Sequence, residues 1–504
     1  MKHVIIVGAG ASGLAAASRL VENGLSTTNI TILEAQNHIG GRVHTVTNDG
    51  NPLEIGAQWV HGQKGNVVFE IAESAHELNT DIQTLESSGF AENVVFGFED
   101  YKLNKEQVQQ FMQTVDSLEE ISKSELSGWN KSLGEYFEEK FNELILSKCS
   151  HSEFDRSTAL AFLDWYHIME NVIDGADNWK ETCGSGHLHY KECSGDPLVT
   201  WKRGYSTLFK ILMKNLSKSH SDQQLPLSDR IFLNKAVTSI DWDSEATSEK
   251  QIQVTCEDGS LYPADFVLVT ASLGFLKSNM HSLFIPALPP YKKRAIQGLG
   301  FGTVDKIFIK FEKPWWTTDW GGISLLRQRS QEADSHWSDH LLGFYTVRLH
   351  PNMLIAWITG KAARQVESLP ENEILKVCSD LLRKYIGADF PFTEPVGLIL
   401  SKWFSNPFTV GSYSYRSMES KEMNVWAADL ALPVYDSNGF PRLFFAGEAT
   451  HDHFYSTTHG AIETGWREAD RIAKYCIGFH NAKLLVYQAQ KCKRDICFWI
   501  TSSN

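Results

Sequence analysis

The predicted fold is decided by one stretch near the start of the chain, which reads Val4-Ile5-Ile6-Val7-Gly8-Ala9-Gly10-Ala11-Ser12-Gly13-Leu14. Four apolar residues predict a buried strand, and the residues after the glycines predict a helix. Gly8 permits a tight turn, Gly10 lets the backbone approach a pyrophosphate, and Gly13 lets the helix pack closely against the strand. A pyrophosphate would then lie at the helix N-terminus, where unpaired N–H groups and the helix dipole favour an anion.

A second strand and an acidic residue follow at the spacing that this motif requires. The strand is predicted over residues 30–33, and Glu34 comes directly after it. An acid at this point holds the ribose hydroxyls of an adenine dinucleotide. The alternative is a glycine-rich turn with a surface glutamate. The order of strand, turn, helix, strand and acid favours the dinucleotide interpretation.

Length and charge limit the classes of protein that the chain can represent. At 504 residues it exceeds one ordinary core, which predicts two domains. The 42% hydrophobic and 21% charged residues are typical of a globular protein. The formal net charge of −14 argues against nucleic acid as a partner and is compatible with a cationic substrate, although solubility alone accounts for most of it.

The lack of a recognisable targeting signal and the spacing of the cysteines predict an intracellular protein without a metal site. The apolar start imitates a signal peptide, but its glycines fit a dinucleotide turn and the strand is short. We expect no membrane span. The eight cysteines show no metal-binding spacing and are expected to be reduced thiols. The last five residues match neither a peroxisomal nor an endoplasmic-reticulum address, so we expect a cytoplasmic location.

Two further motifs follow the strand, turn, helix, strand and acid described above. The run Gly40-Gly41-Arg42-Val43 predicts a cation near the phosphates, with glycines that allow close approach. Residues 54–62 predict a strand that ends in a glycine-flanked loop containing Trp59 and His61. A histidine in such a loop is usually structural, and the sequence by itself favours that interpretation.

The remainder of the chain predicts an alternation between two domains. Residues 64–200 predict a helical insertion, with helices over 105–123 and 132–146. Another helix is predicted within 201–214. Strands over 231–240, 251–257 and 266–270 are expected to return to the dinucleotide sheet. Strands over 304–311, 342–348 and 353–359 predict a mostly antiparallel second sheet.

The predicted fold class is therefore α/β, with a discontinuous Rossmann-like domain interleaved with an α+β domain. The first domain is predicted to comprise residues 1–75, 200–283 and 434–480. The second comprises residues 76–199 and 284–433, and residues 481–504 form a tail.

Two motifs lie in the second half of the chain. Lys306 is in a predicted strand whose alternation places it on one face with Phe308 and Lys310, and a strand lysine is usually exposed. Residues 443–450 predict a buried strand ending in Gly447-Glu448, followed by a helix over 462–475. In a flavoprotein, such a helix N-terminus stabilises the negative charge that the flavin gains on reduction.

Together these motifs resemble those of the flavin-dependent amine oxidases, most closely the polyamine oxidase and spermine oxidase branch. The resemblance covers nearly the whole chain and rests on Gly8-Ala9-Gly10-Ala11-Ser12-Gly13 with Glu34, Gly40-Gly41-Arg42, residues 56–62, the strand around Lys306, Gly411-Ser412-Tyr413-Ser414-Tyr415, residues 444–450, and Ser456-Thr457-Thr458-His459-Gly460-Ala461.

The resemblance implies bound FAD. Ser12, Glu34 and Arg42 would hold the pyrophosphate and ribose, and the backbone of Val237 would meet the adenine. Further family positions surround the ribityl chain and the flavin, namely Gln58, Trp59, Thr270, Glu448, Thr457 and Thr458. The monoamine oxidases bind flavin through a cysteine before the last strand. Residues 408–415 contain no cysteine, so we expect non-covalent FAD.

The resemblance also implies catalytic and substrate-binding residues. Lys306 matches the lysine that holds a water near flavin N5, and His61 matches a histidine beside the substrate amine. Tyr415 matches one wall of the aromatic slot, whereas the opposite wall, Thr457, is not aromatic. Glu192 is a candidate for binding the distal ammonium, in a stretch that does not align with the spermine oxidases.

The function implied is oxidation of a polyamine such as spermine, spermidine or an acetylated form. Hydride transfer to flavin N5, hydrolysis of the resulting imine by water and reoxidation of the flavin by molecular oxygen would give an aldehyde, a shorter amine and hydrogen peroxide. The chain starts at its first sheet strand and shows no sustained heptads, which argues against a histone demethylase. Two alternatives stay open: a flavin oxidase of another amine or amino acid, and a non-catalytic FAD-binding scaffold.

Overall fold

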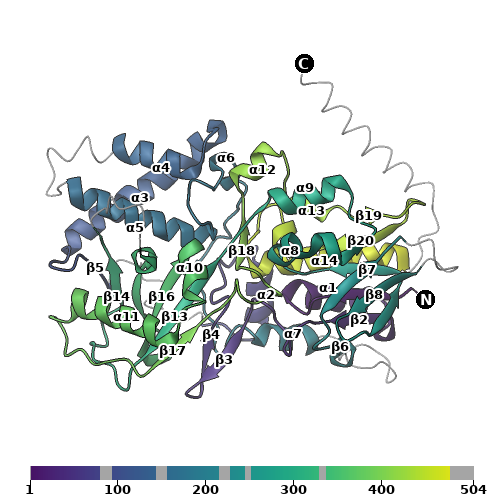
Figure 1. The fold of residues 1–504 in the computed structure, drawn as a ribbon, viewed down its shortest axis with the longest axis horizontal. Helices are drawn as coiled ribbons and strands as arrows, with labels where there is room; N and C mark the ends of the chain where they lie inside the picture. The colour runs from purple at the N-terminus through teal and green to yellow at the C-terminus, as the bar shows by residue number, and fades with distance from the viewer. Residues whose placement is uncertain are drawn as a thin grey trace.

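The computed structural model describes residues 2–79, 93–143, 156–214, 227–243, 251–327 and 336–476. The predicted tail, the end of the predicted helix over 132–146 and residues 477–480 lie outside these ranges. The described residues form an α/β fold built around two six-stranded sheets, one at each end of the molecule (Figure 1). This confirms the predicted fold class.

The first sheet is the predicted dinucleotide-binding sheet, and its strands come from three distant parts of the chain. All of its strand pairs are parallel except the pair of β19 with β20. In spatial order the strands are β19 (Val434–Tyr435), β20 (Pro441–Phe445), β10 (Phe266–Val269), β1 (Val4–Val7), β2 (Ile30–Leu33) and β6 (Ile231–Phe232). The strands β1 and β2 have the bounds that the sequence predicts.

Both faces of this sheet are covered, which explains why its central strands are continuously apolar. Ile6 belongs to the core beneath one layer of helices, and Ile5 to the core on the opposite face. The first layer consists of α1 (Ala11–Glu22), α2 (Val67–Ser74), α7 (Thr207–Lys214) and α14 (Thr458–Cys476). The other face is covered by α8 (Leu273–Leu283), α9 (Pro290–Gly298), α13 (Ala427–Ala431) and a four-stranded sheet.

The predicted strand over residues 231–240 is wrong as one element. The chain leaves the first sheet after β6 and enters the four-stranded sheet with β7 (Val237–Asp241). Asn234, between them, has a φ of 56°, which interrupts an extended strand. The predicted strand over 251–257 also belongs to the smaller sheet rather than the first one. That sheet has the order β11 (Phe284–Ile285), β7, β8 (Ile252–Cys256) and β9 (Leu261–Ala264).

The second large sheet contains the predicted antiparallel strands. Only the pair of β14 with β5 is parallel. The order is β17 (Gly397–Leu400), β13 (Val304–Lys310), β16 (His350–Thr359), β15 (Gly343–Val347), β14 (Gly322–Leu325) and β5 (Val94–Gly97). The strand β5 lies within the region predicted to be helical.

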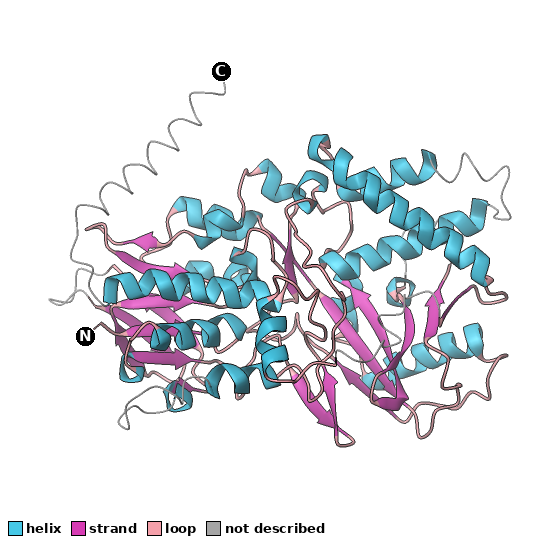
Figure 2. Cartoon of the chain, turned by 180° about the vertical axis from the view of Figure 1, so that it is seen from behind, coloured by secondary structure: helices cyan, strands magenta, loops and turns pink. Residues whose placement is uncertain are grey.

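Helices cover both faces of this second sheet, as Figure 2 shows from behind. One face packs against α3 (Lys105–Glu125), α4 (Leu133–Phe141) and α5 (Arg156–Asp174). The other packs against α10 (Gly360–Val366) and α11 (Glu371–Ile386). The helix predicted over 105–123 is confirmed as α3.

Short elements lie between the two large sheets. They are the hairpin of β3 (Thr45–Asn48) with β4 (Asn51–Glu54), the pair of β12 (Gly300–Gly302) with β18 (Tyr413–Tyr415), and the helices α6 (Gly184–His187) and α12 (Met418–Glu422).

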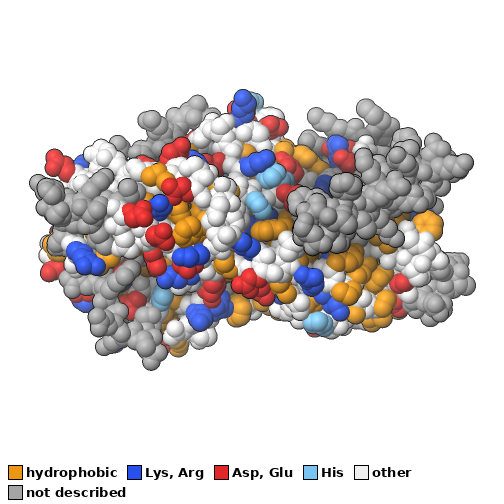
Figure 3. Space-filling view, turned by 90° about the horizontal axis from the view of Figure 1, so that it is seen from above, with side chains coloured by type: hydrophobic (Ala, Val, Ile, Leu, Met, Phe, Trp, Pro, Cys, Tyr) orange, Lys and Arg blue, Asp and Glu red, His pale blue; other side chains and the backbone are white. Residues whose placement is uncertain are grey.

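The predicted domain boundaries remain a prediction. No helix of the described ranges is long and apolar enough to cross a membrane. On the face in Figure 3, acidic and basic side chains are interspersed, without a patch of one sign.

Candidate active site

The glycine turn after β1 has the close contacts that the sequence predicts. Gly8 has a φ of 106°, and a side chain there would meet Thr270 Oγ1. A Cβ on Gly13 would lie 2.1 Å from the carbonyl oxygen of Gly8, so the helix rests directly on the turn. A Cβ on Gly10 would approach nothing closer than 3.9 Å, at Gly40 O. The space beside Gly10 is therefore open to a phosphate.

The first turn of α1 presents unpaired donors beside this space. Gly10 caps the helix without a side-chain hydrogen bond, so the first N–H groups are left for another acceptor. Ser12 is buried, and its hydroxyl has no hydrogen-bond partner within the part of the chain that the structure describes. An orphaned hydroxyl and free N–H groups at a helix N-terminus fit an anionic group such as a pyrophosphate.

Glu34 is held at the end of β2 by backbone donors. Its Oε2 accepts from Ala9 N at 2.7 Å, and its Oε1 accepts from Gln36 N at 2.9 Å. A carboxylate offers about four acceptor sites, so acceptor capacity for ribose hydroxyls is left. The backbone of Lys235 donates to Glu34 O, which places the start of β7, at Val237, near the predicted adenine position.

Arg42 and Glu448 form an ion pair between the glycine turns and the end of β20. Arg42 Nη1 donates to Glu448 Oε1 and to Ser412 O, both at 2.8 Å. Glu448 Oε2 accepts from Ser414 Oγ at 2.6 Å and Ser456 N at 2.8 Å. Arg42 and Glu448 both line a small recess at the end of β20. The structure thus brings together two predicted cofactor residues that are 406 positions apart in the chain.

Thr270 joins this group from the end of β10. Its Oγ1 donates to Val7 O at 2.8 Å, and Gly8 O lies 3.2 Å away. Thr270 therefore fixes the end of β1 at the turn. With Ser12, Glu34 and Arg42 nearby on adjoining segments, the donor and acceptor set fits the FAD that the resemblance implies.

Lys306 is buried rather than exposed, which contradicts the ordinary expectation for a strand lysine. Only 4% of its surface is exposed. Its ammonium donates to Glu54 O, Gly56 O and Gln58 Oε1 at 2.8–2.9 Å. It also lies 4.9 Å from the ring centroid of Trp357. This lysine therefore ties β13 to the loop that carries Gln58.

The same loop carries Trp59, which packs on Trp357 of β16, and the predicted substrate histidine. Trp59 stacks on Trp357 with a centroid distance of 5.7 Å, and its edge faces His61 at 6.4 Å. His61 Nδ1 lies 3.1 Å from Pro197 O. Because a carbonyl oxygen only accepts, Nδ1 carries the proton, and the Nε2 of neutral His61 keeps its lone pair.

The surroundings of His61 favour this neutral form. The ring is accessible to solvent, yet the protein packed around it desolvates the imidazolium and lowers the pKa of His61. The Pro197 carbonyl acts in the opposite direction and is the smaller effect. Near neutral pH the site therefore contains an accessible imidazole that can accept a proton or a hydrogen bond.

Tyr415 and Thr457 are both buried, whereas Glu192 is not placed with them. Tyr415 donates its hydroxyl proton to Glu181 Oε2 at 3.1 Å. Thr457 Oγ1 donates to Phe454 O and accepts from the backbone N–H of Gly460, next to the start of α14 at Thr458. Glu192 is exposed, and its charge acts on Glu119 and Tyr190 rather than on Tyr415.

Sequence reasoning missed a set of acids beneath Tyr415. Burial, followed by the charge of Glu181, raises the pKa of Tyr415, with smaller effects from Asp177 and Asp174. Burial also raises the pKa of Glu170 on α5, to about 8. In the sequence these acids look like the solvated faces of helices, and no spacing distinguishes them. Of these acids, Glu181 contacts the Tyr415 hydroxyl and suits a cationic ligand, whereas Asp177 is paired with Arg364 and Glu170 is protonated near neutral pH.

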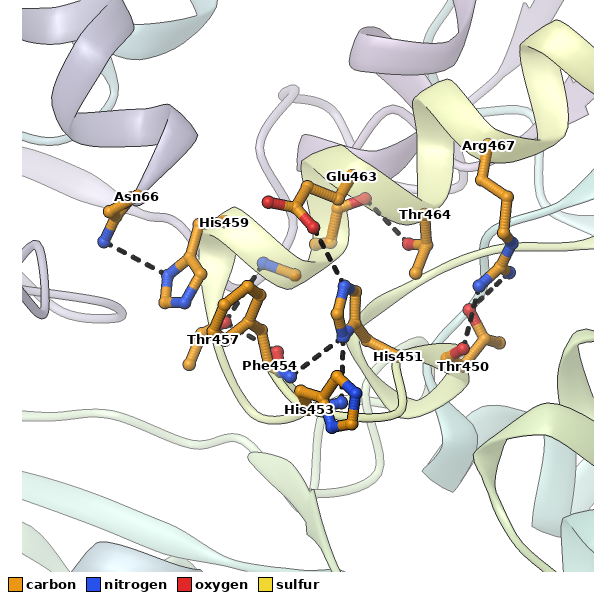
Figure 4. Close-up of polar contacts among 12 residues, drawn as sticks. Asn66, Thr450, His451, His453, Phe454, Thr457, His459, Glu463, Thr464 and Arg467 are labelled. Carbon is orange, nitrogen blue, oxygen red and sulfur yellow. Dashed lines mark hydrogen bonds and ion pairs between the residues drawn. The ribbon is translucent and has the colours of Figure 1, made fainter. Parts of the chain in front are cut away.

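Sequence reasoning also missed the contacts at the start of α14, which Figure 4 shows. His459 Nδ1 lies 3.3 Å from Asn66 Nδ2. His451 Nε2 lies 3.0 Å from Glu463 Oε2, and its Nδ1 accepts from the backbone N–H groups of His453 and Phe454. No group of three or more potential metal ligands occurs in the described part of the chain.

The chain is similar to known proteins in both sequence and structure. The sequence model of a family described as flavin containing amine oxidoreductase matches residues 11–473. The chain is 31% identical to the Peroxisomal N(1)-acetyl-spermine/spermidine oxidase of Bos taurus, covering 93% of this chain and 94% of that protein. It is 29% identical to Polyamine oxidase 1 of Zea mays, covering 98% and 92% respectively.

A solved structure shares the fold. A redesigned triple mutant of putrescine oxidase matches with a TM-score of 0.64 at 19% identity, over 94% of this chain and 98% of that chain. At this level of identity the likeness concerns the fold alone.

Proposed function

This chain belongs to the flavin-containing amine oxidoreductase family, and from that premise we propose that it oxidises polyamines such as spermine, spermidine or their acetylated forms. The chain is an FAD-dependent amine oxidase, as the resemblance of its motifs implies. The names of its relatives from Bos taurus and Zea mays support a polyamine as the substrate. The proposed products are an aldehyde, a shorter amine and hydrogen peroxide.

The observation that carries the proposal is the accessible, neutral imidazole of His61. Its Nδ1 proton is committed to Pro197 O, so Nε2 can take a proton or a hydrogen bond from the substrate amine. An amine must lose its proton before its α-carbon can give up a hydride. His61 would therefore hold the reacting nitrogen in its neutral form.

Glu181, the exposed acid beside Tyr415, would bind a remaining ammonium group. Glu181 contacts the Tyr415 hydroxyl, and Asp177 and Asp174 act electrostatically on the same ring. The positive charges of a polyamine would be attracted to the negative charge in this region. Tyr415 would form one wall of the substrate slot and Thr457 the open side.

Bound FAD would supply the electron acceptor, taking a hydride from the amine α-carbon and passing two electrons to molecular oxygen. Ser12, Glu34 and Arg42 would hold its pyrophosphate and ribose, and Val237 its adenine. The other predicted cofactor positions, Gly8, Gly10, Gly13, Gln58, Trp59, Thr270, Glu448 and Thr458, would surround the rest. Tyr415 would orient the α-carbon, and the N-terminus of α14 would stabilise negative charge. Lys306 would hold a water near flavin N5 in exchange for one of its three present acceptors, as the resemblance implies.

The rival substrate class is an amino acid, which needs an arginine fork for its carboxylate. Arg416 follows Tyr415 in the chain, but it is 1% exposed, donates to His451 O and stacks on Tyr455 with its guanidinium 4.0 Å from the ring centroid. Its Nε and Nη1 have no hydrogen-bond partner among the described residues, but the side chain is buried rather than open to a substrate. A polyamine is therefore favoured over an amino acid.

Anaerobic flavin bleaching tests the proposal directly. The FAD-loaded protein is mixed without oxygen with spermine, spermidine, their acetylated forms, a monoamine or an amino acid, one at a time. Fast loss of flavin absorbance with a polyamine is expected. Bleaching only by the monoamine or the amino acid would overturn the polyamine proposal, and no bleaching by any compound would favour the scaffold.

A cytoplasmic location completes the proposal. The five described cysteines, Cys183, Cys193, Cys256, Cys378 and Cys476, are free thiols, which suits a reducing compartment. The Bos taurus relative is named as peroxisomal, so the two compartments must be compared. Microscopy of the tagged protein with a peroxisomal marker distinguishes them, and co-localisation with the marker would contradict the proposal.

A further inference from the structure

We infer that Asn66 is a positioning residue for His61 and holds the carbonyl of that residue in fixed relation to the first turn of α14. The inference rests on the proposed role of His61 in amine oxidation. Asn66 lies at the N-terminus of α2 and contacts both the backbone of His61 and the side chain of His459. Figure 4 shows its contact with His459 at the start of α14.

The amide of Asn66 has only one orientation that satisfies its neighbours. Its Oδ1 accepts from the backbone N–H groups of Val68 at 3.0 Å and Phe69 at 3.3 Å, which caps α2. Its Nδ2 therefore faces the two remaining partners. These are His61 O at 2.9 Å and His459 Nδ1 at 3.3 Å. Asn66 is completely buried, so no water competes for these contacts.

The second partner, His459, must be a hydrogen-bond acceptor. Asn66 Nδ2 only donates, so Nδ1 of His459 carries a lone pair and the ring is neutral. Burial, aided by the neighbouring rings of His61 and His451, lowers the pKa of His459 to about 3. His459 thus remains an acceptor throughout the physiological range. Each amide proton of Asn66 therefore has its own acceptor, His61 O for one and His459 Nδ1 for the other.

These contacts fix His61 at two points. Asn66 holds its backbone carbonyl, and Pro197 O holds its Nδ1 proton. The direction of the Nε2 lone pair follows from the two together. Without the Nδ2 donor, His61 O and His459 Nδ1 would both lose their hydrogen bond to residue 66. The loop of His61 would then no longer be fixed relative to α14.

The replacement Asn66→Asp removes this donor and keeps the helix cap. A carboxylate still accepts from Val68 N and Phe69 N, so α2 and the FAD content are expected to be retained. The limiting rate of anaerobic flavin reduction by the best polyamine is expected to fall at least about tenfold, because small errors in positioning are costly. The apparent Kd of the amine and the flavin midpoint potential are expected to change little.

The matched control is Asn104→Asp. Asn104 caps α3 in the same way, with Oδ1 accepting from Gln107 N, and is exposed. The same chemical change at this distant cap is expected to leave flavin reduction unchanged. If Asn66→Asp does not fold, Asn66→Ser retains a capping oxygen and loses the same donor.

A double-mutant cycle with His61 separates positioning from a general structural effect. In a His61→Ala background, Asn66→Asp is expected to lower the rate less than about twofold further, because there is no imidazole left to position. An equal fall in both backgrounds, or wild-type reduction by Asn66→Asp, would overturn the inference while the proposed function stands. Failure of the wild-type protein to react with any polyamine would overturn both.

Discussion

At the residue scale, Lys306 shows what a sequence pattern reveals and what it leaves hidden. The alternation of β13 identifies its strand, and the resemblance identifies its role, but neither gives its burial. Three acceptors from the β4 end and the following loop surround its ammonium. These acceptors lie about 250 positions away in the chain, beyond the reach of any local pattern. The acids beneath Tyr415 were missed for the same reason.

The replacement Lys306→Met tests this residue. We expect retention of FAD, because Lys306 contacts the loop of Gln58 rather than the glycine turn, and a fall in turnover of about 10²-fold or more. Oxygen consumption per bound flavin measures it. Lys310→Met, on the same strand but paired with Asp49 and partly exposed, is the control. Equal turnover by the two variants would contradict the role.

A second residue-scale prediction concerns Glu170 and pH. Its folded-state pKa is raised to about 8, so its contribution to stability is present below its ordinary pKa and is lost as pH rises from about 4.5 to 8. Glu170→Gln mimics the protonated form. The variant should gain stability over wild type as pH rises from 5 to 8, by about 1.4 kcal/mol per pH unit.

Thermal midpoints measured across this pH range provide the readout. Glu120→Gln, the same replacement at an exposed site on α3, is the control. A constant difference for Glu170→Gln would show that Glu170 is ionised in the folded protein.

At the element scale, the sequence predicts regular units and misses where the chain changes sheet. The glycine motif specifies β1, α1 and β2 because each step has a local steric reason. The alternation over residues 231–240 continues through Asn234, although β6 and β7 belong to different sheets. A period of two is the same in both sheets, so alternation cannot reveal the boundary. The strand β5 was missed because its partner β14 lies far away in sequence.

Replacing two glycines of the same turn, Gly10 and Gly13, by alanine is predicted to have different effects. A methyl at Gly13 would collide with Gly8 O at 2.1 Å, so Gly13→Ala should displace α1 and cost about 1–3 kcal/mol of stability. Gly10→Ala meets only Gly40 O at 3.9 Å, so the apoprotein should keep its thermal midpoint while FAD binds at least tenfold more weakly. Gly128→Ala, with open space, is the control. Unchanged FAD affinity in Gly10→Ala would contradict a pyrophosphate at this turn.

At the scale of the whole molecule, the cofactor residues join parts of the chain that no single segment contains. Arg42, Ser412 and Glu448 meet in one set of hydrogen bonds between the two large sheets. A ligand held by these groups would stabilise the folded protein as a unit. Its free energy of binding adds to the free energy of unfolding.

Removal of FAD is therefore expected to lower the thermal midpoint. Excess FAD at about 100 times its Kd should restore about 2.7 kcal/mol of stability. Because residues 408–415 contain no cysteine, denaturation and ultrafiltration should release all the yellow colour into the filtrate. Flavin that remains with the denatured protein would contradict non-covalent binding.

The scattered origin of the first sheet has a consequence for biosynthesis. The glycine turn emerges early from the ribosome, but α1 packs against α14, and β20 joins β10 only after residue 441 has been made. At about 5–20 residues per second, this interval lasts roughly 20–90 s. Throughout it the apolar face of α1 that packs against α14 has no partner. The predicted flavin site is therefore complete only once Glu448 and the start of α14 at Thr458 have been made.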